Sequence, residues 1–300
     1  MQSHYKQNSG NEERESILII GGDGTLATAL RSLNHDSKIE IVFSSRSKKH
    51  LDRDVFLDLN KIPSANYFEK YSTIVYLAQS LRYREYPSGL SDLAQINIIA
   101  PRLLAEIAAQ HDSKFVYFST GSVYPSGPLP NSEYGSFKSQ GNLDSYSISK
   151  IFGEKAVEDA CPRSLILRPF FIFGNSHNSQ SLFPSLYRSI QNGETITLKG
   201  LNGLVFNPIS SIDAAKALIH LLSIDATGVF NLCGNEIITL REVIELLSSN
   251  TEREPNIKFI ESEDCLLGNP NKLIESGFHF PSNLRERIVE YVSQVELAKG

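Results

Sequence analysis

The sequence predicts an α/β fold with a doubly wound parallel sheet, and three observations lead to this prediction. Short apolar segments alternate with segments of helical period along the first two thirds of the chain. The first apolar segment, 17–20, is continuous and rich in isoleucine, which is typical of a strand buried on both faces. A glycine-rich turn at 21–27 connects it directly to a helical segment.

The positions of the expected elements follow from this alternation. Strands are expected at 17–20, 39–43, 73–77, 114–118 and 164–167. The first helix is expected to end at residue 33, and others to span 92–110, 144–160 and 212–222. Beyond residue 172 we expect a smaller α/β region, with helices at 182–190, 239–248 and 284–295 and short strands within 193–198 and 258–260.

Composition and charge argue against several classes of protein. The 300 residues are 41% hydrophobic and 21% charged, as in a globular protein, and the formal net charge of -5 gives no attraction to nucleic acid or an anionic membrane. No apolar run reaches the ~18 residues of a membrane span. Residues 1–15 are polar, so we expect a flexible tail without a signal peptide.

The spacing of cysteines and histidines gives no metal-binding pattern. Cys161, Cys233 and Cys265 lie far apart without a CxxC motif, and the seven histidines show no paired spacing. We therefore expect no metal site and no disulfide framework. Free thiols suit a reducing compartment, so a cytoplasmic location is expected.

The turn after the first strand has the small residues that a dinucleotide site needs. Gly21, Gly24 and Ala27 are spaced as GxxGxxA. Glycines permit close approach of the backbone to a pyrophosphate. The helix that Thr25 and Leu26 begin would direct its free N–H groups and positive dipole end toward that anion. We therefore expect Gly21, Gly24, Thr25 and Leu26 to bind a cofactor.

The end of the second expected strand bears on which dinucleotide is bound. Folds that use NAD usually have an acidic residue there to hold ribose hydroxyls, whereas small polar residues with an arginine accommodate a 2′-phosphate. The chain has Ser44, Ser45 and Arg46. This favours NADP(H), with NAD(H) as the alternative. Asp58 and Leu59, after the next apolar run, are expected to flank the adenine.

A tyrosine and a lysine one helical turn apart form a candidate catalytic pair. Tyr146 and Lys150 are spaced i and i+4, so their polar ends can meet on one helix face. A neighbouring ammonium stabilises a phenolate, which would lower the pKa of Tyr146 toward a range useful for acid–base chemistry. Thr120 or Ser119, at the end of a strand, would hydrogen-bond the same substrate oxygen. An ordinary pair on a helix surface is the simpler alternative.

Taken together, these residues resemble the extended short-chain dehydrogenase/reductases, often called NAD-dependent epimerase/dehydratases, from about residue 17 to near the C-terminus. The turn at 21–27 resembles the family's cofactor turn, 118–124 its strand ending in the catalytic Ser/Thr, and Tyr146 with Lys150 its YxxxK motif. Residues 76–79 resemble the family's HLAA segment, and residues 167–174 resemble its LRPxNVYG segment. Asn97 and the late strand at 228–232 also have counterparts in the family.

The resemblance implies a role for each of these positions. Tyr146 would exchange a proton with a carbonyl or hydroxyl oxygen, Lys150 would hold the nicotinamide ribose, and Thr120 would orient the oxygen. The remaining cofactor contacts implied by the resemblance are Leu77, Ala78, Gln79, Asn97, Ser119, Pro169, Phe171 and Ile172.

The chain also departs from the family at positions that choose reaction and substrate. Dehydratases of the family have Asp-Glu after the catalytic Thr, where this chain has Gly121 and Ser122. The Asn and Arg that grip a nucleoside diphosphate are replaced by Phe171 and Phe206. Residues expected to line the substrate site instead, or to supply another grip, are Arg82, Arg84, Ser122, Phe171, Arg188 and Phe206.

These features predict an NADP(H)-preferring oxidoreductase that reduces a sugar-like carbonyl of a small-molecule substrate, with a nucleotide-linked 4-keto sugar favoured. Two alternatives remain open, a nucleotide-sugar C4 epimerase that retains tightly bound NAD and a non-catalytic dinucleotide-sensing protein. We expect a dinucleotide-binding domain over 16–172, completed by 207–233, and a mainly substrate-binding region over 173–300. The resemblance also implies a homodimer formed through the helices at 92–110 and 144–160.

Overall fold

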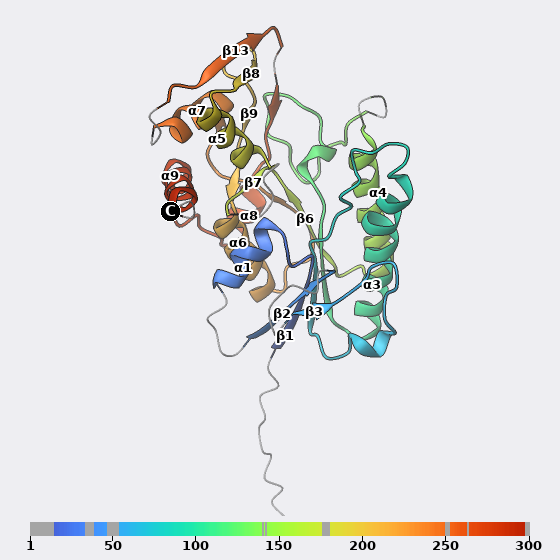
Figure 1. Ribbon diagram of the computed structural model, residues 1–300. Coiled ribbons are helices and arrows are strands. Elements are labelled where there is room, and N and C mark those ends of the chain that lie inside the picture. The colour runs from blue at the N-terminus through green and yellow to red at the C-terminus, as the bar shows by residue number, and fades with distance from the viewer. Residues whose placement is uncertain are drawn as a thin grey trace, which may run out of the picture.

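The computed structural model of the protein describes residues 15–33, 39–46, 54–139, 141, 143–175, 181–249, 253–262 and 264–297. The tail expected at 1–15 lies outside the described residues except for Glu15, which belongs to the first strand. A large twisted sheet carries helices on both faces, and a second, smaller region lies beyond one end of it (Figure 1).

The main sheet has seven parallel strands in the order β11-β6-β5-β4-β1-β2-β3. The order reverses between β1 and β4, so a crevice is expected at their carboxyl ends. This sheet confirms the predicted fold class. The strands are β1 (Glu15–Ile20), β2 (Ile39–Ser45), β3 (Val55–Phe56), β4 (Thr73–Tyr76), β5 (Lys114–Phe118), β6 (Leu165–Pro169) and β11 (Gly228–Leu232).

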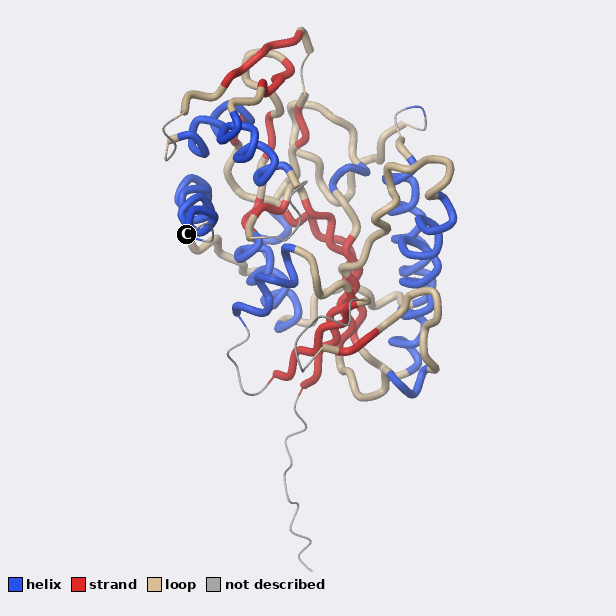
Figure 2. The backbone as a smooth tube through the Cα atoms, in the orientation of Figure 1, coloured by secondary structure: helices blue, strands red, loops and turns tan. Residues whose placement is uncertain are grey.

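Helices cover both faces of this sheet (Figure 2). One face packs on α1 (Thr25–Leu33), α6 (Ser211–Ser223) and α8 (Asn271–Glu275). The other packs on α2 (Leu90–Ala94), the π-helical turn η2 (Gln95–Ile99), α3 (Ala100–Gln110) and α4 (Ser145–Ala160). Along β1, Ile17 and Ile19 enter the first core and Leu18 and Ile20 the second. The continuous apolar run is therefore explained by burial on both faces.

The second region has a core of its own. Its strands form small sheets, in which β7 (Ile172–Phe173) pairs with β10 (Ile209–Ser210), β9 (Val205–Phe206) with β12 (Ile238–Thr239) and β14 (Cys265–Leu266), and β8 (Thr195–Lys199) with β13 (Asn256–Ile260). Its helices are α5 (Leu182–Asn192), α7 (Leu240–Ser248) and α9 (Leu284–Leu297), and two short 3₁₀ turns elsewhere are η1 (Ala65–Tyr67) and η3 (Gly121–Val123). Within the described ranges, no helix has the length and apolarity to cross a bilayer.

The helix expected at 92–110 differs most from its prediction. It begins at Leu90 and contains the π-helical turn η2, in which Asn97 lies. The carbonyl of Asn97 accepts a hydrogen bond of 2.8 Å from the Tyr117 hydroxyl, and this bond holds η2 against strand β5. Helix α4 approaches the same point through Gly153, where an added Cβ would lie 2.2 Å from the Asn97 carbonyl oxygen.

Candidate active site

Helix α4 brings Tyr146 and Lys150 to the carboxyl end of strand β5. The Asp144 carboxylate caps the helix by accepting from the Ser147 amide at 2.7 Å, which starts α4 one residue before Tyr146. Lys150 is only 2% exposed, and its ammonium donates to the carbonyl of Phe118 at 2.8 Å. The predicted i, i+4 pair therefore faces the strand end that carries Ser119 and Thr120 and is not a surface pair.

The buried position of Lys150 changes its ionisation. Burial lowers the pKa of the ammonium to about 7, and the carboxylate of Glu154, one turn further along α4, opposes that shift. Near neutral pH, small electrostatic changes at this site therefore alter the charge of Lys150.

Tyr146 lies within a directed series of hydrogen bonds. The Ser122 amide donates to Thr120 Oγ1 at 3.1 Å, and the Thr120 hydroxyl hydrogen-bonds the Tyr146 hydroxyl. Tyr146 Oη in turn donates to Gln79 Oε1 at 3.2 Å. The phenolic proton is therefore directed away from β5 and toward Gln79.

The expectation that Lys150 lowers the pKa of Tyr146 is wrong for this structure. Burial raises the pKa of Tyr146 to about 12, and the hydrogen bond from Thr120 is what opposes the increase. Lys150 instead directs its ammonium at the Phe118 carbonyl. Tyr146 is therefore a protonated phenol at neutral pH, which is the form that a general acid requires.

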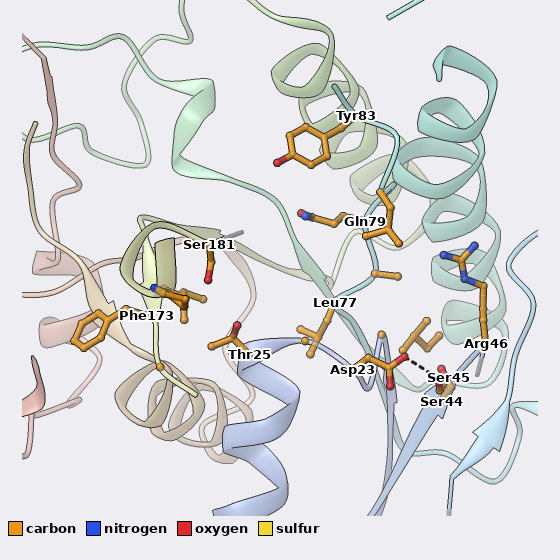
Figure 3. A pocket seen from close by; sticks show the side chains of 18 of the residues that line it. Asp23, Thr25, Ser44, Ser45, Arg46, Leu77, Gln79, Tyr83, Phe173 and Ser181 are labelled. Atoms are coloured by element: carbon orange, nitrogen blue, oxygen red, sulfur yellow. Dashed lines mark hydrogen bonds between the residues drawn. The ribbon is translucent and has the colours of Figure 1, made fainter. Parts of the chain in front are cut away.

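A cavity of about 870 Å³ lies at the switch point of the sheet. Its wall is formed by the ends of β1, β2 and β4, the loop after β4, β7 and the start of α5 (Figure 3). The residues predicted from the sequence that line it are Gly21, Gly24, Thr25, Ser44, Ser45, Arg46, Leu59, Leu77, Ala78, Gln79, Arg84, Phe171 and Ile172.

Tyr146 meets this cavity through two residues of the loop after β4. Gln79 lines the cavity, and its Oε1 accepts a hydrogen bond from the Tyr146 hydroxyl. Tyr83 also lines it, with its ring centroid 5.2 Å from that of Tyr146. Gln79 and Tyr83 therefore connect the acid–base group with the open space.

Several other predicted site residues lie behind the wall or away from it. Leu26 belongs to the core, and Asn97 is fully buried between Ser80 and Ser149. Phe206 is 0% exposed and packs edge-on against Phe171, with ring centroids 5.1 Å apart. The structure places the rest, which are not among the lining residues, in strand ends, loops, the turn η3 and helices α4 and α5: Asp58, Ser119, Thr120, Ser122, Tyr146, Lys150, Pro169, Arg82 and Arg188.

The structure adds lining residues that the sequence analysis missed. Asp23 lies inside the glycine turn and accepts from the Ser45 hydroxyl at 2.8 Å (Figure 3). Tyr83 lies between the two arginines that were singled out, and Phe173 follows the predicted Phe171 and Ile172. Asp23 could have been predicted from the sequence, because it lies within the glycine turn. The position of Tyr83 could not, because it depends on how its loop folds.

The residues of the cavity fit a dinucleotide. Gly21 adopts a φ of 100°, and a Cβ there would lie 2.8 Å from the Ala78 amide, so only glycine gives this close passage of two backbones. The buried Ser119 Oγ has no hydrogen-bond partner among the described residues, which leaves a polar atom for a ligand at the end of β5. Helix α1 begins directly after the turn, with its N-terminus at the cavity wall.

A parallel sheet with a glycine turn and a cavity at its switch point places the protein among the dinucleotide-binding α/β proteins. The chain belongs to the NAD dependent epimerase/dehydratase family, whose model matches residues 17–233. This match confirms the resemblance inferred from the motifs.

Individual relatives are distant. The probable low-salt glycan biosynthesis reductase Agl14 of Haloferax volcanii is 27% identical over 151 residues, which are 48% of each chain. The dTDP-4-dehydrorhamnose reductase of Salmonella typhimurium is 31% identical over 90 residues, 29% of each. The chain spans about half or less of the length of these curated relatives. A structure of MoeE5 with UDP-glucose and NAD superposes with a TM-score of 0.81 at 18% identity, over 95% of this chain and all of that one, and so shares the fold.

The lowered pKa of Lys150 predicts that this residue costs stability. The pKa of Lys150 is about 7 in the folded protein and 10.5 for a solvated lysine, so between these values the unfolded chain binds one more proton and the free energy of unfolding rises with pH. Below pH 7 the buried ammonium of Lys150 destabilises the folded protein to its full extent. Lys150→Met should therefore raise the free energy of unfolding at pH 6 by on the order of a few kcal/mol, a net value that includes the loss of one hydrogen bond. In this variant the free energy of unfolding should no longer rise between pH 7 and 10.

Urea unfolding of both proteins at pH 6 and pH 9 measures this effect. A destabilised Lys150→Met protein at pH 6 would contradict the argument.

Proposed function

We propose that the protein is a nicotinamide-dependent oxidoreductase that reduces the carbonyl of a sugar-like substrate, with a nucleotide-linked 4-keto sugar as the favoured class. The observation that carries this proposal is the directed hydrogen-bond series that ends with the Tyr146 proton at Gln79, beside the cavity. Two relatives are named as reductases, one of a glycan pathway and one of dTDP-4-dehydrorhamnose, which supports the substrate class.

In this mechanism the residues of the chain move and stabilise a proton. Tyr146 Oη gives its proton to the substrate oxygen, and Thr120, which already bonds Tyr146, holds that oxygen in line. Lys150, whose ammonium bonds the Phe118 carbonyl, would hold the nicotinamide ribose. A bound nicotinamide would supply the hydride. Residues of the second region, with Phe171 and Ile172 at its edge, would enclose the substrate.

The residue after Thr120 argues against elimination of water. Gly121 lies against the ring of Phe170, and a Cβ there would come within 2.7 Å of the ring carbons. An aspartate therefore does not fit at this position without displacing Phe170. The acid and base that a dehydratase would need after Thr120 are missing, which favours reduction or epimerisation.

The proposed preference for NADP(H) rests on charge at the far end of the cavity. Arg46 is exposed, lines the cavity, and has no carboxylate ion-pair partner among the described residues. Such a guanidinium suits a 2′-phosphate. The Asp23 carboxylate near Ser45 acts in the opposite sense, because it repels a phosphate. NADPH and NADH are therefore compared in the assay below.

We predict that the protein oxidises one NADPH for each dTDP-4-dehydrorhamnose or related 4-keto substrate reduced. Loss of nicotinamide absorbance at equal molar ratio to product measures this, in parallel with NADH. Tyr146→Phe should lower kcat by about 10² to 10⁴-fold, because the general acid is lost. Converted substrate at constant absorbance would instead indicate the C4 epimerase that retains its NAD. Full activity of Tyr146→Phe would refute the proposed chemistry.

We further propose that Arg84 grips the substrate anion in place of the missing diphosphate clamp. Arg84 lines the cavity beside Tyr83, whose ring lies 5.1 Å from its guanidinium carbon, and it forms no salt bridge within the described residues. Arg82 instead pairs with Glu85 at 2.7 Å and does not line the cavity. Phe171 closes the side where the clamp was expected.

Arg84→Gln should therefore raise KM for the nucleotide sugar about 10-fold or more and leave the Kd for NADPH unchanged, because a charge-assisted hydrogen bond is worth ~1.5–3 kcal/mol. Arg82→Gln is the matched control and should change KM less than about twofold. Equal effects of the two substitutions on KM would remove Arg84 from the substrate site.

We propose a homodimer through the outer surface of α3 and α4. Four apolar side chains lie exposed on these helices and on the adjoining turn η2, Ile99, Leu103, Ile148 and Phe152, and a second copy would bury them. Phe152→Asp should reduce the mass measured by light scattering to that of one 33.4 kDa chain. Phe56→Asp, at a phenylalanine of similar exposure on β3, should leave the mass unchanged. A monomeric parent protein would contradict the proposal.

A further inference from the structure

Gln79 occupies a place that the proposed chemistry does not explain. It aligns with a small residue in the HLAA segment that this chain resembles, yet it has a long amide side chain. That amide projects into the open part of the cavity, near Tyr83 (Figure 3). Its Oε1 also accepts the proton of Tyr146 at 3.2 Å. Gln79 is therefore both part of the cavity wall and the partner of the acid.

The backbone on either side holds Gln79 and Tyr146 at a set spacing. The buried Asn97 amide accepts from the Ser80 amide at 3.1 Å, one residue after Gln79, and donates to Ser149 Oγ at 2.9 Å. Ser149 Oγ in turn donates to the carbonyl of Tyr146 at 2.7 Å. The contact between Gln79 and Tyr146 is therefore supported by a buried network and not left to two free side chains.

The direction of the hydrogen bonds shows that the Tyr146 proton, which would react, is hydrogen-bonded to Gln79. Each hydroxyl carries one proton. The Thr120 hydroxyl accepts a hydrogen bond from the Ser122 amide and bonds the Tyr146 hydroxyl. Tyr146 in turn donates a hydrogen bond to Gln79. Gln79 Oε1 accepts the hydrogen bond of Tyr146 at 3.2 Å, while the Thr120 hydroxyl is the other group that bonds Tyr146. The position of Gln79 Oε1 thus marks where a substrate oxygen would receive the proton.

We propose that Gln79 is a positioning residue that holds the Tyr146 proton toward the cavity and then turns its amide to stabilise the phenolate. A primary amide has an acceptor at Oε1 and two donors at Nε2, so it can partner both forms of a tyrosine. When the O–H bond of Tyr146 breaks, the proton forms a bond to the substrate oxygen. Rotation of the amide then brings an Nε2–H to the phenolate oxygen. Solvent returns one proton to Tyr146 before the next turnover.

This inference rests on the proposed function, and two substitutions separate it from a merely structural role. Gln79→Glu keeps the size of the side chain and its acceptors but loses the donor and adds a charge that repels the phenolate. Its alkaline limb in the pH profile of kcat/KM should move to higher pH, and kcat at pH 7 should fall about 10-fold or more. Gln79→Ala removes the amide that would stabilise the phenolate and adds no charge, so its alkaline limb should also move to higher pH, by less than that of Gln79→Glu.

The matched control is Gln110→Glu, an exposed glutamine at the end of α3, which should change neither kcat nor the profile. The other titratable groups that interact with Tyr146 are Tyr83, Asp144 and Tyr117, and all three stay in place in every variant. The Kd for NADPH should remain within about twofold, because Gln79 would act through Tyr146.

The outcomes distinguish this inference from the proposed function. An inactive Tyr146→Phe with parental kcat and pH profile in both Gln79 variants would overturn the role of Gln79 alone. An alkaline limb that moves to lower pH in Gln79→Ala would also overturn it. An active Tyr146→Phe would overturn the proposed function itself.

Discussion

The buried amide of Asn97 is the contact on which the candidate site depends. It lies in the π-helical turn η2, where its side chain connects the loop after β4 with helix α4 through Ser80 and Ser149. Its own carbonyl accepts the Tyr117 hydroxyl from strand β5. One residue without solvent exposure therefore ties together three elements that each contribute to the site. A π-helical turn often occurs where a helix must place one residue for function, and here it directs both polar ends of Asn97 inward.

A second buried network holds the middle of helix α4, at Glu154. The Arg168 guanidinium of β6 forms two hydrogen bonds with the Glu154 carboxylate, at 2.9 and 2.6 Å, and also bonds the hydroxyl of Tyr124. Tyr124 continues the network to Asn231 of β11. Removing Arg168 or Glu154 would leave the other as an unpaired buried charge, and this destabilises a protein more than the intact pair stabilises it. The same Glu154 acts electrostatically on Lys150, so this network also affects the charge of the candidate site.

Much of the fold could be predicted because strands buried on both faces leave a clear apolar pattern. The strands at 114–118 and 228–232 and the helix at 144–160 agree with their predictions, since turns and polar residues bound them sharply. The interior of 90–110 could not be predicted, because the π-helical turn depends on Asn97 meeting Tyr117 and Ser149 from other elements. Likewise, the pKa of Tyr146 follows from its burial and from Thr120, neither of which helical spacing reveals.

The sequence by itself determined the fold class, the family and the positions of Tyr146, Lys150 and the glycine turn, because each depends on local spacing along the chain. Only the tertiary structure decided which groups meet. Gln79 and Tyr146 are 67 positions apart, and they touch because a buried amide aligns the loop after β4 with helix α4. Phe206 looked like a substrate contact from its place in the chain, yet it is buried behind Phe171. Contacts between distant segments arise from packing, and packing is a property of the whole fold.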